Sequence, residues 1–190
     1  MYRVVRQPIR ILDFDCESRP LGWIGADYVH QEITVIAWKW IGEPGEVEVK
    51  ALSKDDRSRR RMLRAFRKAY DQADMVTGHY IRSFDLPLVN AMLVELGEPA
   101  LGQKLSQDTK TDLPPMKGVS KSQKNLTEMF GVPDGKLDMS VQDWRKANRL
   151  NKAGVEKAVE RAVMDVSQNI ALREVLIDRG LLRPPRVWRP

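Results

Sequence analysis

The stretch Ile9–Pro20, IRILDFDCESRP, carries the pattern that defines the first element of the fold. Branched and aromatic apolar residues dominate Ile9 to Cys16, which predicts a β-strand. Three acids, Asp13, Asp15 and Glu17, occupy every second position, and successive side chains of a strand point to opposite faces. All three carboxylates are therefore expected on one face, with the apolar residues between them on the other.

Three carboxylates on one side of an apolar strand need a neutralising partner, because like charges repel and burial disfavours the ionised form. Oxygen ligands favour Mg²⁺ or Mn²⁺ over zinc, and the chain has 2 His and 1 Cys with which to build a zinc site. The apolar flanks favour a metal site over an edge strand with solvated acids. Asp13 is expected either near the metals or, as we prefer, paired with a basic side chain deeper in the sheet.

The remaining sequence predicts a mixed sheet flanked by helices. Strands expected at Gln31–Ile41 and Glu46–Leu52 complete an antiparallel meander with the first strand. Strands at Met75–Gly78 and Leu105–Thr109, with a helix between them, predict a βαβ unit, so the fold class is α/β. Helices are expected after Ser53 and at Phe84–Leu96, Ser122–Phe130, Val141–Asn148 and Lys152–Arg179. The first helix carries many Arg and Lys residues, which could bind phosphate but more often form a solvated surface.

Length and composition suit one compact domain over residues 1–190, with an irregular basic tail at 180–190. A net charge of +6 and a pI of about 9.5 are compatible with a polyanionic partner such as nucleic acid. The single cysteine, Cys16, excludes an internal disulfide. The sequence shows neither a secretory signal nor a membrane-spanning stretch, so we expect a cytoplasmic protein without a membrane partner.

Two acids far along the chain are candidates for the same site. Asp85 follows the strand end MVTGHY, where open α/β sheets place ligand-binding residues, although a helix-capping aspartate is the alternative and Ser83 is the expected N-cap. Asp165 lies at the margin of the apolar stripe of the last helix, beside Ala162 and Asn169. That stripe is expected to consist of Val155, Val159, Ala162, Val166, Ile170 and Ile177.

Three motifs, in this order and spacing, resemble those of the DEDD (DnaQ-like) 3′–5′ exonucleases of the RNase H-like superfamily. The first is DCE at 15–17 within ILDFDCESRP. The second is FD at 84–85 within VTGHYIRSFDLPLVNAML, and the third is DV at 165–166 within VERAVMDVSQNIALREVL. The resemblance covers roughly Arg10 to Ile177. It is greatest to the small exonucleases of bacteriophages, including the stretch DWRKANRL before the final helix.

The resemblance implies an enzyme that hydrolyses phosphodiester bonds of DNA, single-stranded above all, from the 3′ end with two Mg²⁺ or Mn²⁺ ions. The ions would be bound by four carboxylates: Asp15, Glu17, Asp85 and Asp165. A DNA polymerase or replication protein is an implied partner, and a phage enzyme would act in the cytoplasm of a bacterial host. His79 and Tyr80 match a His-Asn pair of the family and are expected to contact the terminal nucleotide, with packing at a strand end as the alternative.

The chain departs from the family pattern near the last aspartate. The family carries a Tyr four residues, or a His five residues, before it, and this chain has Arg161 and Glu160. On a helix Arg161 lies about 40° from Asp165 and Glu160 about 140°, so Arg161 faces the site. Arginine is no general base near neutral pH, because its pKa is above about 12. It is expected to hold the scissile phosphate or a metal-bound carboxylate, or to pair with Asp165, and the lost base would slow hydrolysis about 10²–10⁴-fold.

Three other functions stay open at this stage: an RNA-directed exonuclease of the same family, a catalytically weakened module that binds nucleic acid or a polymerase, and a structure-specific endonuclease.

Several residues also keep two interpretations. Trp38 and Trp40 could stack on bases, although core packing is more common. Asp108 and Asp112 could extend an acidic cleft or belong to a polar loop. The tail from Arg179 to Pro190 could bind a polymerase or a second subunit.

Overall fold

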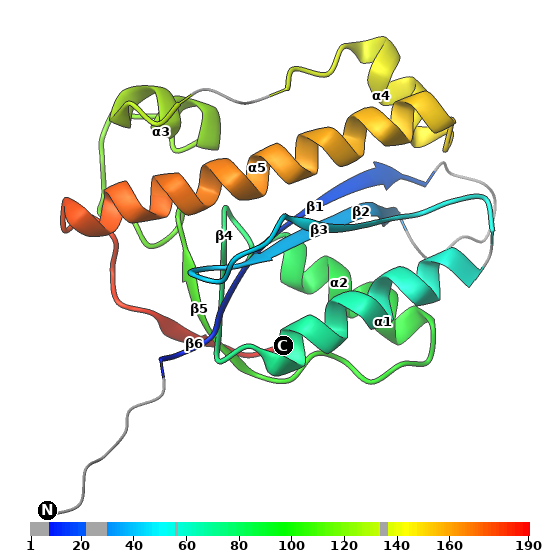
Figure 1. Ribbon diagram of the computed structural model, residues 1–190, viewed down its shortest axis with the longest axis horizontal. Helices are drawn as coiled ribbons and strands as arrows, with labels where there is room; N and C mark the ends of the chain where they lie inside the picture. Colours follow the sequence, from blue (N-terminus) through cyan, green and yellow to red (C-terminus); the bar gives the residue numbers. More distant parts are fainter. Residues whose placement is uncertain (1–7, 22–29, 56, 134–136) are drawn as a thin grey trace, which may run out of the picture.

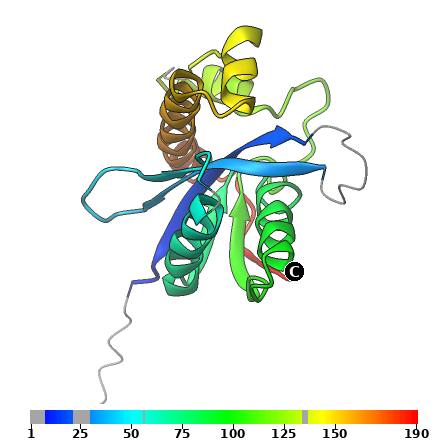
Figure 2. The same ribbon diagram turned by 90° about the vertical axis from the view of Figure 1, so that its right-hand side faces the viewer.

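The computed structural model describes residues 8–21, 30–55, 57–133 and 137–190, and these residues form three layers. A central sheet is covered on one face by helices α1 (Arg57–Gln72) and α2 (Asp85–Glu95), and on the other by the long helix α5 (Lys152–Asp178) (Figure 1). The shorter helices α3 (Gln123–Phe130) and α4 (Val141–Asn148) lie on the α5 side, as the view turned by 90° also shows (Figure 2). The first seven residues, which bear on the expected lack of a secretory signal, lie outside the described residues.

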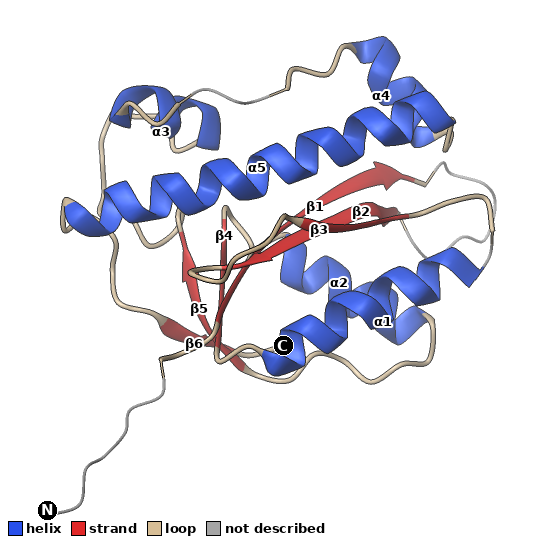
Figure 3. Cartoon of the chain, viewed as in Figure 1, coloured by secondary structure: helices blue, strands red, loops and turns tan. Residues whose placement is uncertain are grey.

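The sheet combines an antiparallel meander with parallel strands. Among the described residues its order is β3-β2-β1-β4-β5-β6. The strands are β1 (Ile11–Pro20), β2 (Gln31–Trp40), β3 (Glu48–Ala51), β4 (Met75–Gly78), β5 (Lys104–Asp108) and β6 (Arg186–Trp188) (Figure 3). β1 pairs antiparallel with β2, β2 pairs antiparallel with β3, and β4 and β5 run parallel to β1 with α2 connecting them. The predicted α/β fold class is confirmed, both in its antiparallel meander and in its βαβ unit.

Strand β1 separates apolar from acidic side chains as its alternation predicts. Leu12 and Phe14 are fully buried in the core between the sheet and helices α1 and α2, and the Phe14 ring lies 4.9 Å from that of Phe66. Burying a side chain of this size contributes about 1.5–3 kcal/mol to folding. Trp38 also belongs to this core, and Trp40 packs against it, so the core interpretation of both tryptophans is confirmed. The acids of β1 therefore face α5.

The buried face of α5 differs from the predicted apolar stripe. Ala158, Ala162 and Val166 pack against β2, whereas Ile177 is 44% exposed. Polar residues of the helix are buried instead: Asp165, Gln168, Asn169 and Arg173. The stripe prediction holds for Ala162 and Val166, which are buried, and for Val159 and Ile170, which pack against them, and it is wrong for Ile177. The polar residues are buried as well because the sheet presents acids and amides to the second half of the helix.

Two local predictions also need correction. Ser83 is not the N-cap of α2, because Phe84 holds that position and provides no side-chain hydrogen bond to the helix. The tail at 180–190 is not wholly irregular, because Arg186–Trp188 pairs with the free edge of β5 and Trp188 is buried in the core. The strand-forming pair Val187 and Trp188 explains this pairing. Within the described residues, no helix combines the length and apolar character needed to span a membrane.

Candidate metal centre

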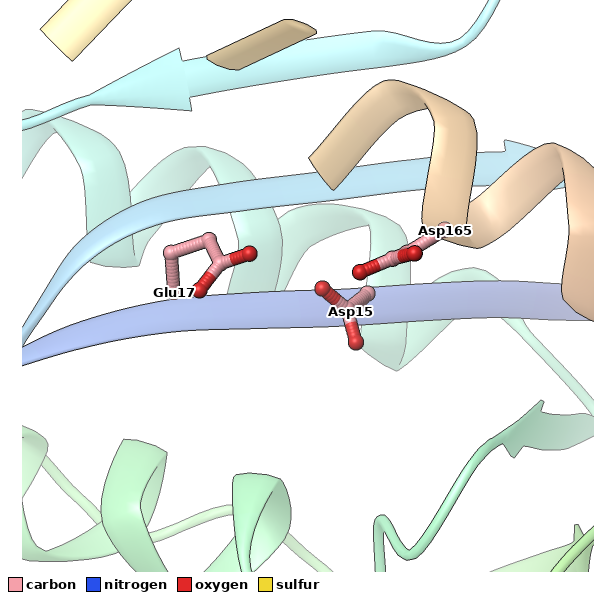
Figure 4. A group of neighbouring side chains, drawn as sticks. All are labelled: Asp15, Glu17 and Asp165. Carbon is pink, nitrogen blue, oxygen red and sulfur yellow. The ribbon is translucent and has the colours of Figure 1, made fainter. Parts of the chain in front are cut away.

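Three carboxylates from distant parts of the chain meet on the α5 face of the sheet. One oxygen from each of Asp15, Glu17 and Asp165 lies within 4.8 Å of the other two. Asp15 and Glu17 project from β1, and Asp165 points down from α5 toward Asp15 (Figure 4). Hard oxygen donors at this spacing suit Mg²⁺ or Mn²⁺, so the donor set fits a metal ion of this class.

Asp85 approaches the same group from the first residue of α2. Its side chain is 3% exposed, and its Oδ1 accepts a hydrogen bond of 3.0 Å from the backbone N–H of Cys16, which lies between the two acids of β1. Burial raises the pKa of Asp85 to about 7, although hydrogen bonds from Cys16 act in the opposite direction. The hydrogen bond therefore fixes the start of α2 against β1 and places a fourth carboxyl group beside the other three.

The charges of this group oppose one another. The pKa of Asp15 is raised well above its usual value, first by burial and then by the neighbouring charges of Asp85, Glu17 and Asp165. The positive charge of Arg161 lowers it in part. A single guanidinium does not offset four carboxylates. A divalent cation would therefore reduce the electrostatic repulsion among these carboxylates.

Arg161 bridges two of the candidate ligands. Its Nε donates to Glu17 Oε1 at 2.7 Å, and its second terminal nitrogen lies 3.4 Å from Asp165 Oδ2. A further hydrogen bond of 3.2 Å reaches the carbonyl of Leu137, and the guanidinium lies 5.5 Å from the ring centre of Trp144. The predicted orientation of Arg161 toward the site is confirmed, and so is its pairing with Asp165.

These carboxylates open into a cavity of about 310 Å³, here called the carboxylate pocket. All the site residues expected from the sequence line it, and the residues that sequence analysis did not identify are Cys16, Phe84, Lys110, Ser122 and Gln123. Gln123 is buried, and its Nε2 donates to the backbone carbonyl of Asp165 at 2.8 Å. No sequence pattern marks Lys110 or Gln123, because each reaches the pocket through the path of a loop or a short helix.

Asp108 shapes the loop that carries His79 and Tyr80. It is fully buried, and its Oδ1 accepts hydrogen bonds from the backbone N–H groups of Tyr80, Lys110 and Thr111. Tyr80 adopts a left-handed backbone (φ 70°), which costs about 1–2 kcal/mol in a residue with a side chain. The connection between β4 and α2 is thus held by a buried acid, and Asp108 does not line the carboxylate pocket.

Asp112 stabilises the other side of this loop. Its Oδ1 accepts a hydrogen bond of 2.7 Å from Arg82, and its Oδ2 accepts one from the backbone N–H of Asp108. The side chain is 2% exposed and lies outside the carboxylate pocket. Of the two interpretations of Asp108 and Asp112, the contacts favour a polar loop over an extended acidic cleft.

A chain of buried polar side chains lies next to the acidic cluster. Asn169 donates to Asp13 Oδ2 at 2.5 Å, and Thr109 donates to Asn169 Oδ1 at 2.6 Å. His79 Nδ1 lies 3.0 Å from the Thr109 hydroxyl, which completes the connection to the carboxylate pocket. Burial raises the pKa of Asp13, while the Asn169 hydrogen bond and the charge of Arg173 lower it. Asp13 thus serves as an anchor for Asn169, and Arg173 is the basic side chain near it.

With this geometry established, comparison with known structures identifies a similar fold. The chain resembles part of a DNA polymerase. One structural match is the family B DNA polymerase from the hyperthermophilic archaeon Pyrobaculum calidifontis, with a TM-score of 0.68 and 21% sequence identity. The match covers 90% of this chain and 25% of the polymerase, so this chain spans about a quarter of that protein's length. No family model matches the sequence, and comparison with curated proteins gives no match.

Proposed function

We propose that this protein is a metal-dependent 3′–5′ exonuclease that acts on single-stranded DNA. The observation that carries the proposal is the meeting of Asp15, Glu17, Asp85 and Asp165 in one open pocket from three separate elements. Structural likeness to a DNA polymerase supports a nucleic-acid substrate, and the net charge of +6 agrees with one. The order of the three acidic motifs supports the exonuclease activity, as the family resemblance implies.

Two Mg²⁺ or Mn²⁺ ions at these carboxylates would lower the pKa of a bound water and stabilise the leaving 3′ oxygen. The rest of the pocket binds the strand end. Tyr80 and Phe84 are 38% and 37% exposed at the pocket, where their rings offer stacking surfaces for bases. Lys110 Nζ lies 3.8 Å from the centre of the Tyr80 ring, so its charge can pair with a phosphate next to a stacked base.

Arg161 occupies the position of the family's general base, but its expected role is to position carboxylates and phosphate. Its fork already contacts Glu17 and Asp165, so it holds both side chains in position before an ion arrives. With metal ions bound at these acids, its terminal nitrogens would be free to donate to a nonbridging oxygen of the scissile phosphate. We therefore expect slow but measurable hydrolysis.

The test uses 20-nucleotide DNA labelled at its 3′ or 5′ end, incubated with Mn²⁺ or with EDTA. Stepwise shortening of 5′-labelled strands and early release of the 3′ label, both dependent on Mn²⁺, are expected. Asp165→Asn should abolish shortening, and Asp178→Asn, which changes an exposed acid on the same helix, should not. Hydrolysis that persists in EDTA, or no hydrolysis by the native protein, would refute the proposal.

Parallel substrates separate the related activities. A matched RNA strand that is shortened faster than DNA would indicate an RNA-directed exonuclease. A circular single strand has no end, so its cleavage would indicate an endonuclease. The first outcome would change the proposed substrate and the second the proposed mode of cleavage, and both would keep the same metal centre.

The ion pairs of Arg161 favour one second candidate, a catalytically weakened module that binds nucleic acid or a polymerase. An arginine that stays bound to Glu17 and Asp165 would compete with metal for both carboxylates. Such a module would show little thermal stabilisation by Mn²⁺. A nuclease site should gain about 2.7 kcal/mol when Mn²⁺ is 100-fold above its Kd, and Asp165→Asn should remove that gain.

A further inference from the structure

A second cavity, here called the cationic pocket, lies between α4 and the segment that follows β3. It measures about 530 Å³ and is lined by Lys54, Gln142, Arg145, Lys146, Arg149 and Asn151. The lining residues include four cations and no carboxylate. Lys54, Arg145, Lys146 and Arg149 are all exposed, so their charged ends are open to a ligand in solution.

The four cations of the cationic pocket differ from the arginines of α1 in their ion pairing. Arg59, Arg60 and Arg64 of α1 form ion pairs with Glu95 or Glu98, which occupy their charges. Within residues 8–21, 30–55, 57–133 and 137–190, no ion pair involves any of the four cations of the cationic pocket. Asp143, the acid of α4, is bound by Lys157 at 2.6 Å. The positive charge of the pocket is therefore available to an external anion.

Close packing fixes the backbone of α4, which carries Arg145 and Lys146 and is followed by Arg149. A Cβ on Gly154 of α5 would lie 2.3 Å from the backbone nitrogen of Ala147, which means that α4 approaches α5 as closely as backbone atoms allow. Arg19 of β1 donates to the carbonyl of Asn148 at 2.7 Å. Helix α4 is thus attached to both α5 and the sheet, and a ligand at the cationic pocket would meet a preformed surface.

The cationic pocket is connected to the carboxylate pocket through α4. Trp144 lies next to Arg145 in the chain, and its ring centre is 5.5 Å from the guanidinium of Arg161 in the carboxylate pocket. Helix α4 therefore supplies residues of the cationic pocket and also contacts a residue of the carboxylate pocket.

We propose that the cationic pocket binds backbone phosphates of a single-stranded nucleic acid, internal to the end that enters the carboxylate pocket. The part about the strand end rests on the proposed function, whereas phosphate binding by the cationic pocket does not. Each phosphate neutralised by a cation releases condensed counterions, so binding through this pocket weakens as salt rises.

The experiment measures binding of a fluorescein-labelled 20-nucleotide oligo-dT by anisotropy in EDTA, between 50 and 200 mM NaCl. Metal is absent, so failure of the exonuclease proposal would not alter the result. For single strands the logarithm of affinity falls with the logarithm of salt by about 0.7 per phosphate contact. Arg145→Gln/Arg149→Gln should reduce the slope by about 1.4, so the native protein should lose about sevenfold more affinity across this range than the variant.

Two further variants keep the test specific. Arg145→Lys/Arg149→Lys retains both charges and should restore most of the salt dependence. Lys39→Gln/Lys68→Gln removes two charges from residues that line neither pocket and should leave the slope within about 0.3 of the native value. An unchanged slope in Arg145→Gln/Arg149→Gln, or an equal reduction in the control, would overturn the proposal. Circular dichroism of each variant verifies that α4 is still folded.

Discussion

Asp85→Asn should stabilise the metal-free protein at alkaline pH, although it removes a candidate ligand. An aspartate has a pKa of about 3.9 in an unfolded chain, and Asp85 has one of about 7 in the fold. A raised pKa means that the folded state binds the proton more tightly. The contribution of Asp85 to stability is therefore most favourable below about pH 4 and is lost as pH rises to about 7.

The size of this effect follows from the pKa difference. At 1.36 kcal/mol per pKa unit, the raised pKa of Asp85 destabilises the fold by about 4 kcal/mol at pH 8, where the folded side chain is ionised. At pH 5 the loss is about 1.5 kcal/mol, because the unfolded chain is then ionised whereas the folded side chain keeps its proton. Asparagine stays neutral, and its Oδ1 can still accept the hydrogen bond from the Cys16 N–H. The stability gained by Asp85→Asn should thus be about 2.5 kcal/mol larger at pH 8 than at pH 5, whatever the constant cost of the weaker hydrogen bond.

Urea unfolding in EDTA at the two pH values measures this difference directly. Asp178→Asn is the control and should differ from the native protein by less than about 0.5 kcal/mol, because it changes an exposed position. Addition of Mn²⁺ should reverse the order, since the native protein gains stabilisation that Asp85→Asn lacks in whole or part. A variant that is no more stable than the native protein at pH 8, or a gain that does not depend on pH, would refute the reasoning.

Two other substitutions test the supports of the site. Gly154→Ala should cost about 1–3 kcal/mol in urea unfolding, because the added Cβ would lie 2.3 Å from the Ala147 nitrogen, whereas Gly102→Ala, with nothing within 4 Å of its Cβ, should be nearly neutral. Asn169→Ala should cost about 1–3 kcal/mol because it removes the hydrogen bond to buried Asp13, and an unchanged unfolding midpoint would contradict the structural role of that bond.

Local patterns predict the structure correctly where a short periodic segment has one face in the apolar core and the other at a polar surface. The alternation of β1 separates acids from apolar residues, and its period of two leaves a single arrangement of faces for a strand of this composition. The βαβ unit was also predictable, because strand and helix patterns alternate there with clear breaks at Gly78 and Gly97. The family resemblance then connected acids that no local pattern links.

The remaining features depend on contacts between distant segments. Asn169 and Arg173 of α5 are buried because they meet Asp13 and Gln107, and the helical pattern, which places them beside or within the apolar stripe, does not identify these partners. The strand in the tail needs the free edge of β5 in addition to its own strand-forming residues, and that edge depends on the sheet order. Gln123 reaches Asp165 only through the placement of α3. Each case requires the tertiary arrangement that local patterns do not encode.

Anomalous X-ray diffraction from a crystal soaked in Mn²⁺ would show whether these carboxylates form one metal centre. Manganese peaks are expected in the carboxylate pocket, within about 2.0–2.4 Å of oxygens from Asp15, Glu17, Asp85 and Asp165. Arg161 should move from at least one of its carboxylate partners toward the pocket opening. A soaked crystal with no manganese in this pocket, and Arg161 still paired with Glu17 and Asp165, would rule out a metal centre at these residues.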